Sequence, residues 1–226
     1  MKEESIVLLS GGLDSTVLLW YAKKYSEVKV IQYTDYGHLS HKLDLKAANN
    51  VSHIFNKKHE ADCLLNKIEM NTRSVLYGDS VDARSGIPTT FMPGRNLLLL
   101  TMAAATAYAS KIKQIYIGVS EIDSNYPDCT EDFIKGAEVV LNLALGIDLE
   151  EEKIRIMAPF LFFNKKKIIK LGVKLGAPIF ETRSCYRAGL LPCLKCAACK
   201  NRMDAFKELG IRDESISIER WEAYDG

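Results

Sequence analysis

The feature that most restricts the fold is a short apolar run that leads through a glycine turn into a helical pattern. Residues 5–9 read Ser-Ile-Val-Leu-Leu, which is typical of a buried strand. Gly11 and Gly12 follow, and apolar residues then recur at helical spacing, at Val17, Leu18, Tyr21 and Ala22. A strand that passes through such a turn into a helix predicts a β-α unit, with the glycine pair at the carboxyl end of the strand.

The alternation of strand and helix continues along most of the chain. Further strands are predicted at residues 27–33, 114–118 and 154–158, and helices at residues 40–57, 96–110, 131–145 and 164–175. Residues 71–93 are mixed and rich in glycine and proline, and they predict a long functional loop. The pattern predicts an α/β fold with a doubly wound parallel sheet, which binds ligands beyond the carboxyl ends of its strands.

Composition and charge exclude several classes of protein. Hydrophobic residues make up 47% of the 226 residues and charged residues 26%, as in an ordinary globular protein. The net charge of +1 provides no global attraction to nucleic acid, so a nucleic-acid partner is not expected. Acidic residues Glu3 and Glu4 stand where a signal peptide would be apolar, and no stretch has the length of a membrane span. We therefore expect a cytoplasmic protein that does not contact membranes.

The segment from Ser10 to Ser15, Ser-Gly-Gly-Leu-Asp-Ser, has the chemistry of a phosphate-binding loop. Glycines let the backbone approach an anion closely, and the first amides of the following helix lack intrahelical partners and carry partial positive charge. Ser10 and Ser15 add hydroxyl donors, and Asp14 could hold a magnesium ion bound to the phosphates. An ordinary strand-to-helix turn capped by Asp14 or Ser15 is the alternative interpretation.

Four cysteines crowd into fifteen residues, in the spacing Cys185-x7-Cys193-x2-Cys196-x2-Cys199. Four thiolates complete a tetrahedral zinc site and leave no open position, which predicts a structural zinc. An iron–sulfur cluster or a redox-active cysteine pair are the alternatives. The cluster divides the chain into a main domain, residues 1–182, and a small C-terminal zinc-binding helical module, residues 183–226.

The loop resembles the signature of the PP-loop ATP pyrophosphatases, a HUP/Rossmann-like superfamily, and differs from the Walker loop. The resemblance implies that ATP is cleaved between its α and β phosphates and that AMP passes to a substrate oxygen. It implies catalytic roles for Asp14, Ser15 and Lys165, with Mg²⁺ as a cofactor. The implied ATP-binding residues are Leu9, Ser10, Gly11, Gly12, Leu13, Asp14, Ser15, Thr16, Val17, Leu18 and Leu19.

Together with the cysteines, several segments resemble the 7-cyano-7-deazaguanine synthase (QueC) family. They span most of the chain, from about Ile6 to Arg202: Pro93-Gly94-Arg95-Asn96, Gly118-Val119, Glu121, Tyr126-Pro127-Asp128-Cys129, Asn164-Lys165 and Ser184-Cys185-Tyr186. The implied substrate-binding residues are Arg95, Asn96, Glu121, Tyr126 and Asp128. Three of these residues also have a plain structural interpretation: a surface ion pair for Arg95, a helix cap before Glu131 for Asp128, and core packing for Tyr126. Ser120, Ile122 and Thr130 differ from the residues expected of the family.

The resemblance implies an enzyme of queuosine biosynthesis that adenylates 7-carboxy-7-deazaguanine and converts it with ammonia to the amide and then to the nitrile. It also implies a homodimer. Three alternatives stay open: a relative that stops at the amide or joins the activated carboxylate to another amine, such as a protein; a tRNA thiolase of the same superfamily; and a non-enzymatic zinc-knuckle protein. The histidines, His38, His41, His53 and His59, could include a base or could occupy solvated helix positions.

Overall fold

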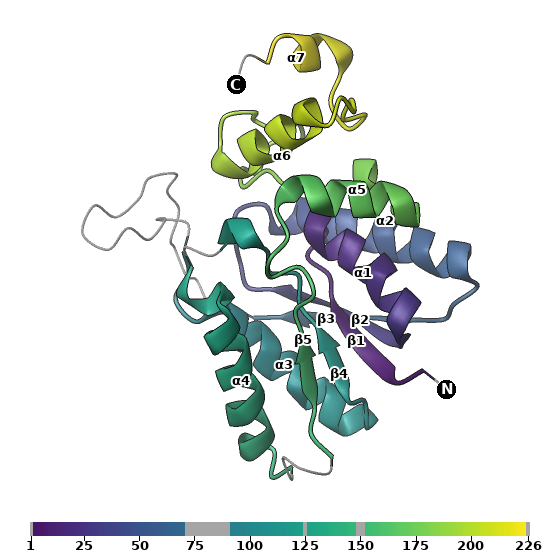
Figure 1. Ribbon diagram of the computed structural model, residues 1–226, viewed down its shortest axis with the longest axis vertical. Helices are drawn as coiled ribbons and strands as arrows, with labels where there is room; N and C mark the ends of the chain where they lie inside the picture. The colour runs from purple at the N-terminus through teal and green to yellow at the C-terminus, as the bar shows by residue number, and fades with distance from the viewer. Residues whose placement is uncertain (1, 71–90, 124–125, 148–151, 225–226) are drawn as a thin grey trace.

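A five-stranded parallel sheet forms the centre of the molecule in this computed structural model, which describes residues 2–70, 91–123, 126–147 and 152–224. The strands lie in the order β3-β2-β1-β4-β5, and every neighbouring pair is parallel. Their bounds are Glu4–Leu8 (β1), Glu27–Asp35 (β2), Leu64–Glu69 (β3), Gln114–Tyr116 (β4) and Arg155–Met157 (β5). The predicted parallel α/β class is confirmed (Figure 1).

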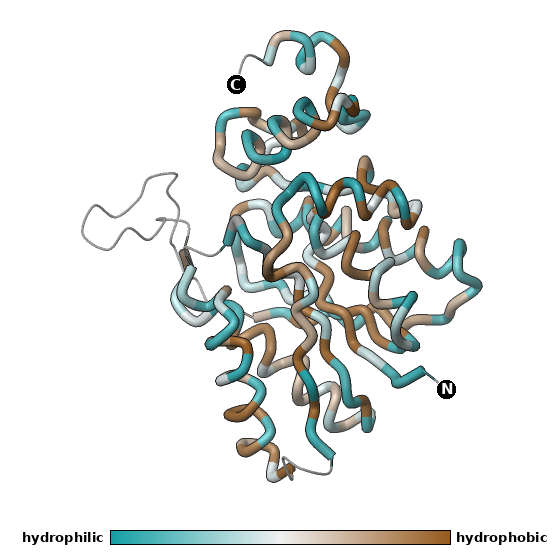
Figure 2. Tube along the Cα trace, viewed as in Figure 1, coloured by the Kyte–Doolittle hydropathy of each residue, from teal (hydrophilic) through white to brown (hydrophobic). Residues whose placement is uncertain are grey.

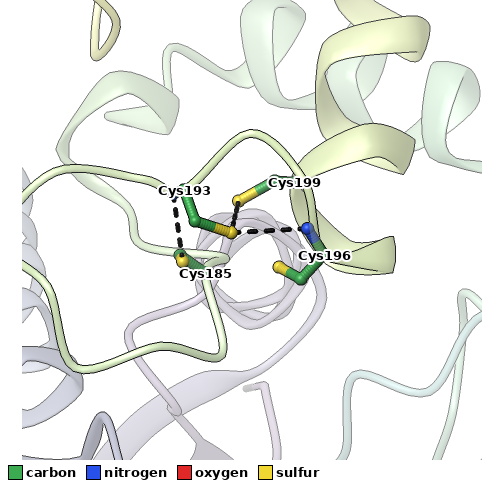
Figure 3. Close-up of side chains that lie close together, drawn as sticks. All are labelled: Cys185, Cys193, Cys196 and Cys199. Atoms are coloured by element: carbon green, nitrogen blue, oxygen red, sulfur yellow. Dashed lines mark hydrogen bonds between the residues drawn. The ribbon is translucent and has the colours of Figure 1, made fainter. Parts of the chain in front are cut away.

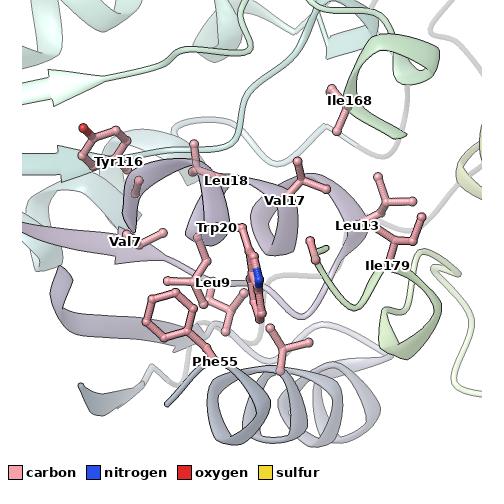
Figure 4. Close-up of a cluster of buried hydrophobic side chains, with 14 of the residues drawn as sticks. Val7, Leu9, Leu13, Val17, Leu18, Trp20, Phe55, Tyr116, Ile168 and Ile179 are labelled. Carbon is pink, nitrogen blue, oxygen red and sulfur yellow. The ribbon is translucent and has the colours of Figure 1, made fainter. Parts of the chain in front are cut away.

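Helices cover both faces of the sheet. On one face lie α1 (Leu13–Tyr25), α2 (His41–His59) and α5 (Lys165–Leu175), and on the other lie α3 (Arg95–Ser110) and α4 (Glu131–Ala144). Successive side chains of a strand point to opposite faces of the sheet, so β1 contributes to both hydrophobic cores. Val7 packs in the core on the side of α1, whereas Ile6 packs in the core on the side of α3. Figure 4 shows the first core around α1, and Figure 2 shows that hydrophobic residues concentrate on the central strands.

The strand order places a topological switch point beside β1. The chain leaves β1 for β2 and β3 on one side and then returns to β4 and β5 on the other, so the loops after β1 and β4 diverge. In open parallel sheets, the crevice at this point is the usual ligand site. The glycine pair follows β1 directly and therefore lies at the mouth of that crevice.

Besides three short 3₁₀ helices, η1 (Glu121–Asp123), η2 (Pro127–Cys129) and η3 (Ile179–Glu181), the sequence analysis missed the strand β3 and the short helix α7 (Ile218–Glu222). Strand β3 is an edge strand without a fully buried residue, and its sequence Leu-Leu-Asn-Lys-Ile-Glu lacks the apolar run that marks the other strands. The predicted loop at 71–93 lies almost wholly outside the described residues. Among the residues that the structure describes, no helix is both long and apolar enough to cross a membrane.

The C-terminal segment contains α6 (Ala197–Glu208), which packs against α5, and α7. Arg202 on α6 is buried and pairs with the buried Asp213, and it also donates to the carbonyl oxygens of Ile179 and Thr182. These bonds connect residues on the two sides of residue 182. The division of the chain into two domains at that residue therefore stays a prediction.

Candidate functional site

A cavity of about 550 Å³ opens at the switch point of the sheet. Its volume is in the range of small-molecule binding sites. Strand ends, the phosphate loop, the start of α3 and the C-terminal module all contribute to its walls, represented by Leu8, Gln32, Ile117, Asp14, Arg95 and Asn201. The cavity therefore joins the two regions that the sequence singled out, the loop and the cysteine module.

The loop conformation depends on Gly11, whose φ is +79°. A Cβ on Gly11 would lie 2.4 Å from the backbone oxygen of Asp44 in the first turn of α2, so only glycine lets the loop pack there. Gly12 is the N-cap of α1, and no side chain caps that helix end. The partial positive charge of the helix start is thus left available to a ligand.

Two serines shape the inner surface of the loop. Their hydroxyl oxygens lie 3.0 Å apart, and Ser15 Oγ accepts a hydrogen bond from the backbone amide of Ser10. Ser10 Oγ accepts in turn from the amide of Gly12. These bonds fix the turn and place both hydroxyl groups at the cavity.

Asp14 and Lys165 form an ion pair in the cavity wall, with Lys165 Nζ 2.5 Å from Asp14 Oδ2. Both belong to the first turn of a helix, and Asn164 caps α5 by accepting from the amide of Lys167. The other oxygen of Asp14, Oδ1, is buried and lacks a hydrogen-bond partner among the described residues. This carboxylate is therefore held in place and retains an acceptor for a further group.

The eleven expected ATP-binding residues form two groups: those that line the cavity and those that do not. Six of them line the cavity: Leu9, Ser10, Gly12, Leu13, Asp14 and Ser15. Gly11 and Thr16 lie behind the loop surface, while Val17, Leu18 and Leu19 are fully buried in the core around α1. The helical turn after Ser15 carries these last three side chains into the protein interior, where they pack in the core. The expected ATP-binding role of the eleven residues stays a prediction.

The expected substrate-binding residues divide in the same way. Arg95, Asn96 and Tyr126 line the cavity, whereas Glu121 is exposed and does not. Asp128 is buried behind the wall: its Oδ2 accepts from the Asn96 amide at 3.0 Å, and its backbone oxygen accepts from the Asn96 side chain at 2.9 Å. Asp128 therefore fixes the start of α3, and the cap of α4 is instead Thr130. Neither Glu121 nor Asp128 lines the cavity that the described residues form, and a substrate-binding role for these two residues stays a prediction.

Asp123 occupies the cavity wall near the place expected for Glu121. Its Oδ2 accepts from the amide and hydroxyl of Ser120, at 3.1 Å and 2.9 Å. Burial raises the pKa of Asp123, and the negative charge of Asp14 raises it further. The sequence analysis did not identify Asp123. A short 3₁₀ helix, η1 (Glu121–Asp123), places Asp123 at the cavity and leaves Glu121 exposed.

Arg95 carries a cation into the same cavity. Burial alone would lower the pKa of its guanidinium, but the neighbouring Tyr36, Asp128 and Cys129 more than compensate, so the pKa is raised. Arg95 is thus a permanent cation with a planar fork of donors, which suits a carboxylate or a phosphate.

Several further polar residues line the cavity, and of these the sequence analysis gave a possible site role only to His38, as a candidate base. They come from β2, the loop after it, α2 and the C-terminal module: Gln32, Thr34, Tyr36, His38, Ser40, Asp44, Arg183, Ser184, Tyr186 and Asn201. Gln32 Nε2, Thr34 Oγ1 and His38 Nδ1 are buried without a hydrogen-bond partner among the described residues. Buried polar atoms are rarely left without a hydrogen bond, so these three atoms are suited to form hydrogen bonds with a polar ligand in the cavity. Only the tertiary structure brings them together.

The four cysteine sulfurs lie within 4.8 Å of one another (Figure 3). Zinc–sulfur bonds of about 2.3 Å in a tetrahedron separate the sulfurs by roughly 3.8 Å, and Cys193 and Cys199 are already 3.9 Å apart. Backbone amides of Cys193 and Cys196 point to cysteine sulfurs at 3.3 Å, and Leu194 makes the tight turn with a φ of +58°. The donor set and its spacing fit a metal ion such as zinc.

The metal centre adjoins the cavity. Cys185 lines it, as do Ala197 and Ala198 at the start of α6. The backbone amide of Arg183 donates to the carbonyl oxygen of Gly11 at 2.9 Å, which ties the start of the module to the phosphate loop. The cysteine cluster therefore positions one wall of the cavity.

This architecture defines a class: nucleotide-binding α/β proteins with a PP-loop at the switch point of a parallel sheet. The sequence matches the family described as "Queuosine biosynthesis protein QueC" over residues 4–210. It is 35% identical to the 7-cyano-7-deazaguanine synthase of Persephonella marina over 229 residues, covering 97% of this chain and 100% of that protein. It is 37% identical to the proteins of the same name from Sulfurihydrogenibium sp. and Clostridium kluyveri, covering 92% and 93% of this chain and 96% of each relative. The chain belongs to the QueC family.

Proposed function

We propose that this protein is an ATP-dependent 7-cyano-7-deazaguanine synthase, which converts 7-carboxy-7-deazaguanine and ammonia to the nitrile. One observation carries the proposal in a chain of this family: a single cavity joins an uncapped helix start, suited to phosphate, to the partly buried cation Arg95. A nucleotide and a planar anionic substrate could therefore meet within it.

The chemical problem is that a carboxylate is a poor electrophile and hydroxide a poor leaving group. In the proposed reaction a carboxylate oxygen attacks the α-phosphorus of ATP, the bond to pyrophosphate breaks, and an acyl adenylate forms. Ammonia then forms the C–N bond and AMP leaves, which gives the amide. A second adenylation, on the amide oxygen, lets AMP leave with loss of the remaining nitrogen-bound protons, which gives the nitrile.

The residues of the cavity suit the electrostatic demands of these steps. The first amides of α1, with the hydroxyl groups of Ser10 and Ser15, would hold the phosphates. Lys165 would offset the charge of the departing pyrophosphate, and Arg95 would orient the substrate carboxylate. A magnesium ion held by Asp14, whose Oδ1 lacks a partner among the described residues, would neutralise phosphate charge.

The cysteine site would hold a structural zinc through Cys185, Cys193, Cys196 and Cys199. With all four positions occupied by thiolates, the metal would fix the module rather than activate a substrate. We also propose that the enzyme acts in the cytoplasm and as a homodimer, as the family resemblance implies. Size-exclusion chromatography with light scattering measures the oligomeric state.

The test is product analysis by mass spectrometry after incubation with 7-carboxy-7-deazaguanine, ammonium, Mg²⁺ and ATP. We expect AMP, pyrophosphate and the nitrile, with the amide as an intermediate. Release of ADP in place of AMP would contradict the proposal, and so would turnover without a modified deazapurine. An amide that accumulates without nitrile would indicate a synthase that stops after the first adenylation.

A further inference from the structure

Arg183 lies between the phosphate loop and the cysteine cluster, two residues before Cys185. Its backbone amide donates to the carbonyl oxygen of Gly11 at 2.9 Å. Its side chain, which is only 10% exposed, places Nε 3.3 Å from Asp44 Oδ1. The backbone oxygen of Asp44 is the atom against which Gly11 packs most closely. Arg183 therefore contacts both the phosphate loop and the turn of α2 on which that loop rests.

The same side chain also reaches into the cysteine cluster. Nη2 of Arg183 donates to the carbonyl oxygen of Arg187 and to that of Gly189, the latter at 2.9 Å. Both carbonyl groups belong to the loop between the first and second cysteines of the cluster. Every residue from 186 to 191 is exposed, so core packing does little to hold this loop. The planar guanidinium serves acceptors from two parts of the molecule in fixed directions.

These contacts connect the order of one site to the order of the other. A metal ion bound by Cys185 and Cys193 would close the loop between them at both ends, and closure removes most conformations of a chain segment. The two carbonyl acceptors of Arg183 would then be held in place, and with them the guanidinium beside Asp44. Without the metal the loop would be free to open, and Arg183 would lose two fixed acceptors.

We propose that Arg183 is a positioning residue that couples metal binding at the cysteine cluster to ATP binding at the phosphate loop. The proposal rests on the ATP and metal sites of the proposed function, and it is independent of the acceptor. It gives the metal an effect on nucleotide affinity in addition to its effect on the fold. Because coupling between two binding sites is reciprocal, ATP should raise the affinity for the metal by the same factor.

The first test compares wild type with Arg183→Met, which keeps the backbone bond to Gly11 and removes the guanidinium. Calorimetry measures the Kd for ATP–Mg²⁺ with zinc bound and after chelation, with circular dichroism to show that the fold is kept. In wild type, chelation should raise this Kd about 5- to 150-fold, the usual range of coupling between sites. In Arg183→Met, which should still bind about one zinc, chelation should change the Kd less than about threefold.

The reverse measurement is the zinc affinity, obtained by competition with a chelator in the presence and absence of ATP. ATP should raise this affinity in wild type by the factor found for the Kd of ATP, and it should have little effect in Arg183→Met. Two unequal factors in wild type would show that one of the titrations measures unfolding rather than coupling, and would overturn the proposal.

Hydrogen exchange tests the same coupling in the zinc-loaded protein, and it decides the matter if the metal-free protein does not stay folded. None of residues 187–191 lines the cavity, so ATP cannot protect their amides by direct contact there. ATP should nevertheless slow exchange at residues 187–191 in wild type. In Arg183→Met, ATP should slow exchange at residues 10–16 and leave residues 187–191 unchanged.

Two further variants separate the guanidinium fork from its charge. Arg183→Lys keeps the positive charge but lacks the planar fork, so it should lose the coupling as Arg183→Met does. Lys195→Met is the matched control, because Lys195 is an exposed cation of the same module and does not line the cavity. It should behave as wild type in each measurement.

An equal effect of chelation on ATP affinity in wild type and Arg183→Met would overturn the proposal. Full coupling in Arg183→Lys would overturn it too, and so would a wild type in which ATP leaves exchange at residues 187–191 unchanged. A wild type that binds no ATP would contradict both this proposal and the proposed function. A wild type that binds ATP with the expected coupling but forms no nitrile would contradict the proposed function alone.

Discussion

Lys165 Nζ lies 2.5 Å from Asp14 Oδ2, although the two residues are 151 positions apart in the chain. The ion pair joins the first turn of α5 to the first turn of α1, so two helix starts meet in the cavity wall. Both side chains are largely shielded, with 16% and 20% of their surface exposed. A carboxylate in this position can retain a metal ion or a cation next to phosphates that the helix starts attract.

Replacing Asp14 should therefore abolish nucleotide chemistry. We expect Asp14→Ala to reduce AMP release by about 10²- to 10³-fold or more, as for other residues that stabilise transition-state charge. The measurement is AMP and pyrophosphate formation by chromatography, with circular dichroism to show that the fold is kept. Asp132→Ala is the control, since Asp132 also lies in the first turn of a helix, α4, but is exposed away from the cavity. Similar losses in both variants would contradict the assignment.

Gly11 should tolerate no side chain. In Gly11→Ala the positive φ and the contact of 2.4 Å with the Asp44 backbone oxygen would act together, so the loop must move. Gly37→Ala separates the two effects, because Gly37 has the same φ of +79° but open space around its Cβ position. We expect Gly37→Ala to cost about 1–2 kcal/mol of unfolding free energy. Gly11→Ala should cost more and should also lose the thermal stabilisation by ATP, measured by differential scanning fluorimetry.

The metal should be required for the C-terminal module. Cys196→Ser should reduce bound zinc from about one ion per chain to nearly none, and should lower the melting temperature, because metal binding contributes to folding. Metal content is measured by mass spectrometry of the purified protein. Cys63→Ser is the control, since Cys63 is a buried cysteine outside the cluster, and it should retain the metal. A Cys196→Ser protein with full metal content would refute a four-thiolate site.

The pair formed by Arg202 and Asp213 should be important for stability. Both are almost completely buried, so Arg202→Met leaves an unpaired carboxylate in the interior and should cost about 3–5 kcal/mol of unfolding free energy. Adding Asp213→Asn should recover part of that loss. Urea denaturation measures both. Lys166→Met, which breaks the exposed ion pair with Glu208, should cost less than about 1 kcal/mol.

Asp123 should make stability depend on pH. Its folded pKa is raised by burial and by Asp14, so the folded state keeps the proton longer than the unfolded state does. Its contribution is therefore most favourable below the ordinary aspartate pKa of about 3.8, and is lost as the pH rises through the raised pKa. Asp123→Asn should raise the melting temperature at neutral pH and change it little at low pH. Asp62→Asn, at an exposed position, should change neither, and an equal effect at both pH values for Asp123→Asn would contradict this account.

Much of the fold follows from local sequence patterns. The apolar run before Gly11 marks β1, and local patterns mark the helices α1–α5, because strand and helix periodicity are properties of neighbouring residues. Strand β3 was not predicted, because an edge strand is held by backbone hydrogen bonds to its neighbour and does not need a run of apolar residues. For the same reason of locality, the spacing of the four cysteines was enough to predict a metal site.

The sequence by itself determined the parallel α/β class, the phosphate loop and the cysteine cluster, since each depends on residues close together in the chain. Only the tertiary structure decided which residues face the cavity. In the folded protein Asp128 lies behind the cavity wall, whereas Asp123 lies in that wall. His38, Asp44 and Arg183 come from three segments of the chain and lie together at the cavity. The physical reason is that side-chain direction and long-range contact depend on how the elements pack, which no local pattern records.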